Sequence, residues 1–110
     1  MSAGVGSGSL VRAASVTDVP PGWVLKVRVD TTELALANCG GEIIALENAC
    51  SHAGGPLGDN RLKDGCHLEC PWHNSVFDAR TGEVVRGPAR KAQKRYPVTV
   101  EDGSIYVSVE

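Results

Sequence analysis

The middle of the chain, residues 49–75, restricts most strongly what this sequence can fold into. It reads ACSHAGGPLGDNRLKDGCHLECPWHNS and is rich in Gly, Pro, Cys and His. A chain of 110 residues buries only about two-thirds of its unfolded surface, so its core is modest. A small domain that spends about a quarter of its length on irregular loops needs something to order them. A bound metal can do so, because its binding free energy becomes folding free energy.

Short strand patterns precede this stretch. Between residues 23 and 29, apolar side chains occupy every second position and alternate with basic ones, which predicts a half-buried strand. The apolar runs 34–37 and 43–46 flank a turn sequence, Asn-Cys-Gly-Gly at 38–41. These runs therefore predict a β-hairpin.

A second group of strand patterns follows the central stretch. Apolar residues alternate over 96–100 and again over 105–109, and Glu-Asp-Gly-Ser at 101–104 joins them as a second predicted hairpin. No window of ten or more residues has helical apolar spacing, and at most one short turn is expected before Pro20. The expected fold class is all-β, a small antiparallel β-sandwich or barrel with a loop-rich, metal-binding subdomain.

Charge and composition exclude several classes of protein. The net charge is −2, so electrostatics predict neither nucleic acid nor an anionic membrane as a partner. No apolar run approaches the roughly 20 residues of a membrane-spanning helix. Residues 1–8 are rich in Gly, Ser and Ala and do not resemble a secretory signal. We expect a flexible tail at 1–8, a single domain at 9–110 and a cytoplasmic location, where Cys/His clusters more often bind metal than form disulfides.

Two short motifs in the central stretch carry the metal-binding chemistry. They are Cys50-Ser51-His52 and Cys70-Pro71-Trp72-His73, with seventeen residues between His52 and Cys70. Together they offer two thiolates and two imidazoles, which suit either one tetrahedral zinc ion or a [2Fe–2S] cluster. Structural zinc sites usually place like ligands together in one loop, whereas each loop here mixes Cys with His. The mixed loops favour the cluster, and a structural zinc-binding module is the alternative.

The two-part motif resembles the Rieske [2Fe–2S] signature, in which two histidines ligate one iron. Further matching elements are Gly54-Gly55-Pro56-Leu57, Phe77-Asp78 with Thr81-Gly82, Gly87-Pro88-Ala89 and Tyr96-Pro97-Val98. The chain is most similar to the stand-alone Rieske ferredoxins of bacterial ring-hydroxylating (aromatic) dioxygenase systems. This resemblance implies a Rieske fold and one [2Fe–2S] cluster per chain, held by loops at about 49–75 and covered by a loop at about 86–90. The ligands it implies, which are also the metal ligands, are Cys50, His52, Cys70 and His73.

The function that the resemblance implies is electron transport rather than catalysis. The chain would pass single electrons from a flavoprotein reductase to a terminal Rieske non-haem iron oxygenase. A chain of 110 residues has no room for the mononuclear iron domain of such an oxygenase, so no catalytic residue is predicted. An alternative within the family is the small subunit of another reductase, such as a nitrite reductase.

Departures from the Rieske proteins of respiratory complexes predict a low reduction potential. Those proteins carry a disulfide between the ligand loops and a serine and tyrosine that donate hydrogen bonds to sulfur. Here Gly55 and Trp72 replace the two cysteines, Ser75 keeps the serine, and Phe77 replaces the tyrosine. Fewer donors stabilise the reduced cluster less, which predicts a potential near the low end of the Rieske range, roughly −150 mV.

Two cysteines and one histidine lie outside the predicted ligand set, and one tryptophan lies within a ligand loop. We expect Cys39 and Cys66 to be ordinary, partly buried residues, because the expected compartment does not favour a disulfide between them. His67 alternates with Leu68 on an expected strand, so it should face solvent and bind no metal. Trp72 lies inside the second ligand loop, where it could shield the cluster, contact a partner or pack between loops.

Overall fold

The chain folds into short strands with very little helix. The structure, a computed structural model, describes residues 10–49, 61–63, 66–72, 74–87, 89 and 91–109. Within these ranges the elements are β1 (Val11–Ser15), the 3-10 helix η1 (Val16–Asp18), β2 (Val24–Val29), β3 (Thr32–Cys39), β4 (Glu42–Glu47), β5 (His67–Glu69), β6 (Val76–Asp78), β7 (Val84–Arg86), β8 (Arg95–Tyr96), β9 (Val98–Glu101) and β10 (Ser104–Val107). The predicted all-β, antiparallel fold class is confirmed.

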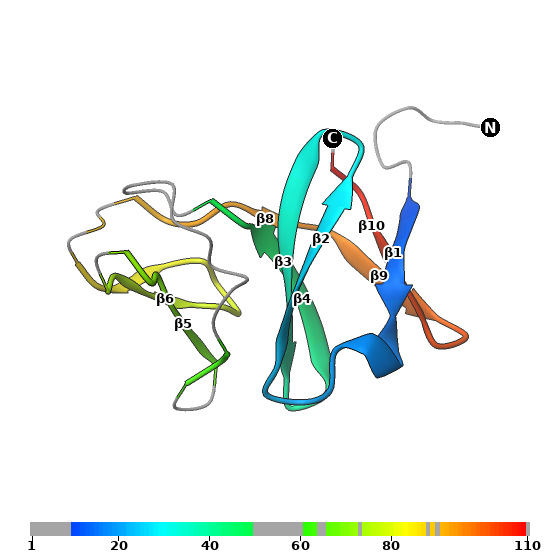
Figure 1. The fold of residues 1–110 in the computed structure, drawn as a ribbon, viewed down its shortest axis with the longest axis horizontal. Helices are drawn as coiled ribbons and strands as arrows, with labels where there is room; N and C mark the ends of the chain where they lie inside the picture. Colours follow the sequence, from blue (N-terminus) through cyan, green and yellow to red (C-terminus); the bar gives the residue numbers. More distant parts are fainter. Residues whose placement is uncertain are drawn as a thin grey trace.

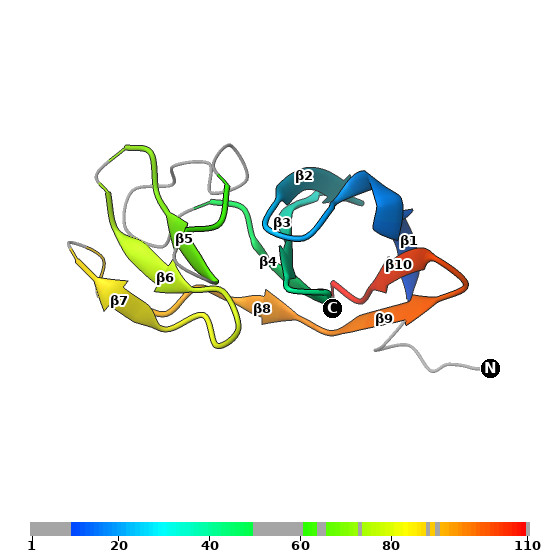
Figure 2. The ribbon, with the colours of Figure 1, turned by 90° about the horizontal axis from the view of Figure 1, so that it is seen from below.

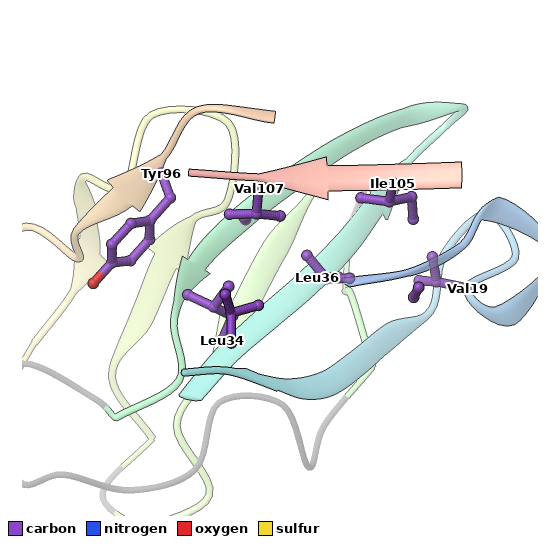
Figure 3. Close-up of a cluster of buried hydrophobic side chains, with 9 residues drawn as sticks. Val19, Leu34, Leu36, Tyr96, Ile105 and Val107 are labelled. Atoms are coloured by element: carbon purple, nitrogen blue, oxygen red, sulfur yellow. The ribbon is translucent and has the colours of Figure 1, made fainter. Parts of the chain in front are cut away.

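Two of the three sheets enclose the main hydrophobic core. One has the strand order β1-β10-β9 and the other has the order β2-β3-β4-β8, and Figure 2 shows them curving around a common centre. Figure 3 shows Leu34 and Leu36 of β3 pointing toward Ile105 and Val107 of β10. The buried members of this core are Ala14, Val19, Val29, Leu34, Leu36, Ala45, Tyr96, Ile105 and Val107.

Strand β3 is buried on both faces, because a third sheet packs on its other side. Leu34 and Leu36 belong to the main core, whereas the intervening Ala35 and Ala37 contact residues of the third sheet. Successive side chains of a strand point to opposite faces, so this alternation follows from the strand itself. The small alanine side chains allow the third sheet to approach closely.

The third sheet, β5-β6-β7, forms a separate layer beside the other two (Figures 1 and 2). Leu68 of β5 packs with Ile44 and Leu46 of β4, and Phe77 of β6 packs with Ala35. Both Leu68 and Phe77 are fully buried. β5 ends just before the second predicted ligand motif and β6 begins shortly after it, so the packing of this sheet determines where Cys70 lies.

The two predicted hairpins are present. β3 and β4 pair in the expected register around Gly40 and Gly41, which have φ values of 64° and 109°. β9 and β10 pair around Asp102 and Gly103, with φ values of 51° and 76°. Positive φ at both central residues is what the type I′ two-residue hairpin turn requires.

The strand boundaries differ from the sequence pattern at two places. β3 continues through Asn38 to Cys39, so only the two glycines form the turn. The run 96–100 is divided, because β8 ends at Tyr96 and pairs with β4, whereas β9 begins at Val98 and pairs with β10. Pro97, which lacks a backbone N–H to donate, lies at the point where the chain changes sheets.

Cys39 and Cys66 are paired in the structure, contrary to the expectation that they would be unrelated residues. The structure joins them as a disulfide between Cα atoms 5.5 Å apart, and both are buried. Cys39 ends β3, whereas Cys66 precedes β5. The pair therefore links the four-stranded sheet to the third sheet.

Candidate metal centre

The structure describes one of the four predicted ligands. Cys70 lies directly after β5, whereas Cys50, His52 and His73 lie outside the described residues, as does Pro88 of the predicted covering loop. Within the described ranges, no three His, Cys, Asp or Glu side chains converge on a common point that could hold a metal ion. The four-residue ligand set therefore stays a prediction.

The thiol of Cys70 is buried and free. Only 1% of this residue is exposed, and it packs against Ala35, Phe77 and Ala89. The two other described cysteines, Cys39 and Cys66, are bonded to each other, whereas Cys70 has no disulfide partner. A thiol in such surroundings has the chemistry of a soft-metal ligand that is protected from water.

Two backbone hydrogen bonds close the loop that follows Cys70. The N–H of Asn74 donates to the carbonyl of Cys70 at 2.9 Å, and the N–H of Cys70 donates to the carbonyl of Ser75 at 2.8 Å. Asn74 has a φ of 62°, a left-handed conformation that Asn tolerates better than most residues. The loop is thus anchored at both ends before any metal is considered. Trp72 within it is 59% exposed, so it does not serve as interior packing.

Ser75 connects this loop to the predicted covering segment. Its side chain is fully buried, and its Oγ accepts a hydrogen bond of 2.9 Å from the backbone N–H of Ala89. Ala89 packs against Cys70. The family resemblance implies that Ser75 could donate a hydrogen bond to sulfur, and the structure shows that its oxygen accepts one from the N–H of Ala89.

Three charged side chains, those of Lys63, Glu69 and Arg86, form a connected group beside the same loop. Nη2 of Arg86 is 3.6 Å from Oε2 of Glu69 and donates at 3.3 Å to the carbonyl of Asn74. Nζ of Lys63 bonds the other carboxylate oxygen of Glu69. The hydrogen bond from Lys63 lowers the pKa of Glu69 below its ordinary value, against the effect of burial, and the charges of Lys63 and Arg86 act in the same direction as the hydrogen bond.

His67 lies on a strand, as the sequence pattern predicted. His67 is half-buried on β5, opposite Asp78 of β6. It lines an open groove of about 480 Å³ together with Lys63, Glu69, Val76, Val85 and Arg86. Leu68, the next residue, points into the core instead. His67 therefore lies on the face of β5 opposite to the buried Leu68.

Sequence reasoning missed Gln93, a buried residue that bonds the end of the segment leading into the first ligand motif. Nε2 of Gln93 donates to the carbonyl of Glu47 at 2.7 Å and to that of Ala49 at 2.5 Å. Ala49 directly precedes Cys50. Gln93 occurs in a basic, polar segment without apolar periodicity, so no sequence pattern marked it as buried.

The residues around Cys70 fit an iron–sulfur cofactor. A free, buried thiol lies at the start of a loop that is closed by its own backbone, and apolar side chains surround it. Thiolate ligation is the basis of iron–sulfur binding, and such a site needs a shell that limits water. The class defined by this fold and site is a small antiparallel β domain whose third sheet carries a buried, free thiol in a loop suited to metal binding.

Comparison with known proteins identifies the family. The Rieske [2Fe-2S] domain family matches residues 9–97. The chain is 38% identical over 95 residues to the 3-phenylpropionate/cinnamic acid dioxygenase ferredoxin subunit of Photorhabdus laumondii, a match covering 86% of this chain and 90% of that protein. The chain therefore belongs to the Rieske [2Fe–2S] family.

Solved structures give the same result. The ferredoxin of carbazole 1,9a-dioxygenase from Nocardioides aromaticivorans IC177 superposes with a TM-score of 0.87 and 30% identity, covering 94% of this chain and 100% of that one. A chain in a complex of reduced oxygenase and oxidized ferredoxin in carbazole 1,9a-dioxygenase gives a TM-score of 0.84 and 30% identity, covering 92% and 94%.

These relatives place the chain among the ferredoxins rather than the oxygenases of the family. They confirm the predicted resemblance, the [2Fe–2S] cofactor, and the role of a non-catalytic electron carrier. In the part of the chain that the structure describes, no helix has the length and apolar character needed to cross a membrane.

Proposed function

We propose that this ferredoxin carries single electrons from a flavin-dependent reductase to a terminal ring-hydroxylating oxygenase, using a cluster held by Cys50, His52, Cys70 and His73. The observation that carries the proposal is the state of Cys70, which is buried, unpaired and positioned at the start of a closed loop. The match to the Rieske family covers all four residues.

The cluster supplies a centre that accepts one electron and releases it again. The chain's own residues keep water away and hold the ligand loop still. Phe77, Ala35 and Ala89 enclose the Cys70 thiol, and the bond between Ser75 and Ala89 keeps the covering segment against it. A site that is already ordered needs little rearrangement when its charge changes by one electron.

The oxygenase as acceptor is supported by the likeness to the ferredoxin found in complex with the reduced oxygenase of carbazole 1,9a-dioxygenase. The exposed indole of Trp72 lies within the ligand loop, and aromatic side chains are enriched at the centres of protein interfaces. We propose that Trp72 contacts the partner. A flavoprotein is the proposed donor because flavins convert hydride chemistry to single-electron steps.

The domain bounds and the cellular location of this protein are also proposals. We propose one Rieske domain over residues 9–110, supported by the family match at 9–97 and by the buried residues that the third sheet shares with β3 and β4. We also propose a cytoplasmic location. The buried disulfide between Cys39 and Cys66 is unusual for that compartment, so cell fractionation with an antibody to the protein is the test.

Replacement of the ligands tests the site directly. Cys50→Ala, His52→Ala, Cys70→Ala and His73→Ala should each abolish iron and sulfide binding in purified protein. His67→Ala is the matched control for the histidines, because His67 lies on the groove side of β5. Bleaching by His67→Ala with retention of the cluster by His73→Ala would show that the ligand set is wrong.

Electron delivery needs its own assay. A flavin-dependent reductase supplied with a reduced nicotinamide as electron donor should reduce an oxygenase only when the ferredoxin is added. Trp72→Ala should slow that transfer while leaving the iron content and the reduction potential unchanged. A Trp72→Ala variant with wild-type transfer rates at every oxygenase concentration would exclude this contact.

A further inference from the structure

The side chain of Gln93 uses both of its donors on the strand end that leads into the first ligand motif. Gln93 is only 4% exposed. Its two amide protons are directed to the carbonyls of Glu47 and Ala49, at 2.7 and 2.5 Å. A carboxamide nitrogen has two N–H donors, so these contacts use its donor capacity completely.

The backbone of Gln93 is itself held from two sides. Its N–H donates to the carbonyl of Gly82 at 2.6 Å, and the carbonyl of the next residue, Lys94, accepts a 2.8 Å bond from the N–H of Glu47. Gly82 has a φ of 81°, and a Cβ atom at that position would overlap the backbone oxygen of Gln93. The glycine thus permits a close approach that fixes Gln93 beside the end of β4.

The contact with Ala49 acts directly on the residue that follows it. The carbonyl of Ala49 and the nitrogen and Cα of residue 50 belong to one planar peptide unit. A hydrogen bond that fixes the direction of this carbonyl therefore restricts the orientation of the peptide unit that enters Cys50. We infer that Gln93 is a positioning residue for the first ligand loop and sets how Cys50 is presented to the cluster. The inference rests on the proposed ligand set.

A purely structural role for the amide is the competing explanation, and the chain contains a matched comparison. Asn38 is also a buried carboxamide, and its Nδ2 donates to the carbonyl of Val19 at 2.8 Å while its Oδ1 accepts from the N–H of Gly41. Asn38 thus joins β3 to the segment after η1 and to the hairpin turn, and none of its partners adjoins a ligand motif. Loss of either amide should lower global stability, because buried carbonyls lose their donors.

The test compares Gln93→Met with Asn38→Leu, since each replacement keeps the approximate shape and removes the amide. Cluster-loaded proteins are mixed with an iron chelator, and the bleaching rate and reduction potential are measured. Gln93→Met should bleach about 10- to 100-fold faster than wild type, the range typical of lost outer-shell partners, and its potential should shift. Asn38→Leu should lower the unfolding temperature without changing the potential or the bleaching rate by a comparable factor.

A second variant covers the case in which Gln93→Met does not fold. Gln93→Ala leaves space in which water can bond both carbonyls, and it should give the same rapid bleaching and shifted potential. Wild-type bleaching and potential in the folded Gln93 variant would overturn the inference. Equal changes in the Gln93 and Asn38 variants would do so too, because they would show a general loss of stability.

A measurement on iron-free protein separates this inference from the proposed function. Without iron, Gln93→Met should exchange the backbone amide hydrogens of Glu47 and Asn48 faster than wild type, and Asn38→Leu should not. If wild-type protein binds no iron and sulfide, the proposed ligand set fails and the positioning role fails with it. A wild-type cluster with no effect of Gln93 on exchange, bleaching or potential contradicts the positioning role alone.

Discussion

The buried hydroxyl oxygen of Ser75 accepts a 2.9 Å hydrogen bond from the backbone N–H of Ala89. The two residues are fourteen positions apart, and they join the end of the second ligand loop to the segment predicted to cover the cluster. This bond holds residue 89 against the end of the second ligand loop. It also means that Ser75 has a structural task in addition to any donation to sulfur.

Removal of that hydroxyl should destabilise the protein. Ser75→Ala leaves the buried N–H of Ala89 without an acceptor, which costs about 1–3 kcal/mol. Thr81→Ala is the control, because Oγ1 of Thr81 also accepts from a backbone N–H, that of Glu83 at 3.1 Å, but on the exposed surface. Its effect should stay within about 0.5 kcal/mol. Denaturant unfolding measures both, and equal losses would contradict the account.

Phe77→Tyr should raise the reduction potential. Phe77 is fully buried and packs against Cys70, so a hydroxyl added to this ring would lie in the apolar surroundings of the thiol. A hydrogen bond to sulfur favours the reduced, more negative state, and about 1 kcal/mol of such preference corresponds to about 40 mV. Potentiometric titration of the two proteins measures the difference. A variant with an intact cluster and no upward shift would refute the argument from missing donors.

The disulfide between Cys39 and Cys66 should contribute to stability but not to cofactor binding. It closes a sequence separation of 27 residues, for which the chain-entropy account gives about 3–4 kcal/mol. Reduction of wild-type protein with dithiothreitol should therefore lower its resistance to denaturant, whereas the Cys39→Ala, Cys66→Ala double variant should be insensitive to the reductant. Both should keep their iron. Loss of iron from the double variant, or a wild type insensitive to reduction, would disagree with the structure.

Tyr96 should make stability fall at alkaline pH. Burial raises the pKa of its phenol above 10.0, and the charge of the Glu47 carboxylate, which accepts its hydrogen bond at 3.3 Å, raises it further. Above about pH 10 the unfolded chain releases this proton before the folded protein does, so the free energy of unfolding decreases as pH rises. Tyr96→Phe removes this titration. The stability difference between the two proteins should shrink as pH rises from 8 to about 11, and parallel curves would be inconsistent with it.

Much of the fold follows from local patterns in the sequence. Period-two alternation gave the strands around 23–29, 96–100 and 105–109, and the glycine turns gave both hairpins. The division at Pro97 was not predicted, because alternation does not reveal which sheet a strand joins. The double burial of β3 depends on the third sheet, a long-range arrangement that no local window contains.

The chemistry of the candidate site could be predicted from the sequence, but the side chains that hold its loops in place could not. Cys70 was singled out from the spacing of Cys and His, and its thiol is buried and free, but its ligation stays a prediction. The bonds of Gln93 to the carbonyls of Glu47 and Ala49, and of Arg86 to the carbonyl of Asn74, were not predicted, because both residues lie in a basic, polar segment without apolar periodicity. Side chains that bond backbone carbonyls carry no periodic signal, so only tertiary structure reveals them.

Metal and sulfide analysis combined with a reductive titration tests the central claim most directly. Protein purified without oxygen should contain about two iron atoms and two acid-labile sulfides per chain and take up about one electron. Its reduced form should give an EPR signal that disappears in the Cys70→Ala variant. A colourless protein with one zinc ion and no sulfide would contradict the account.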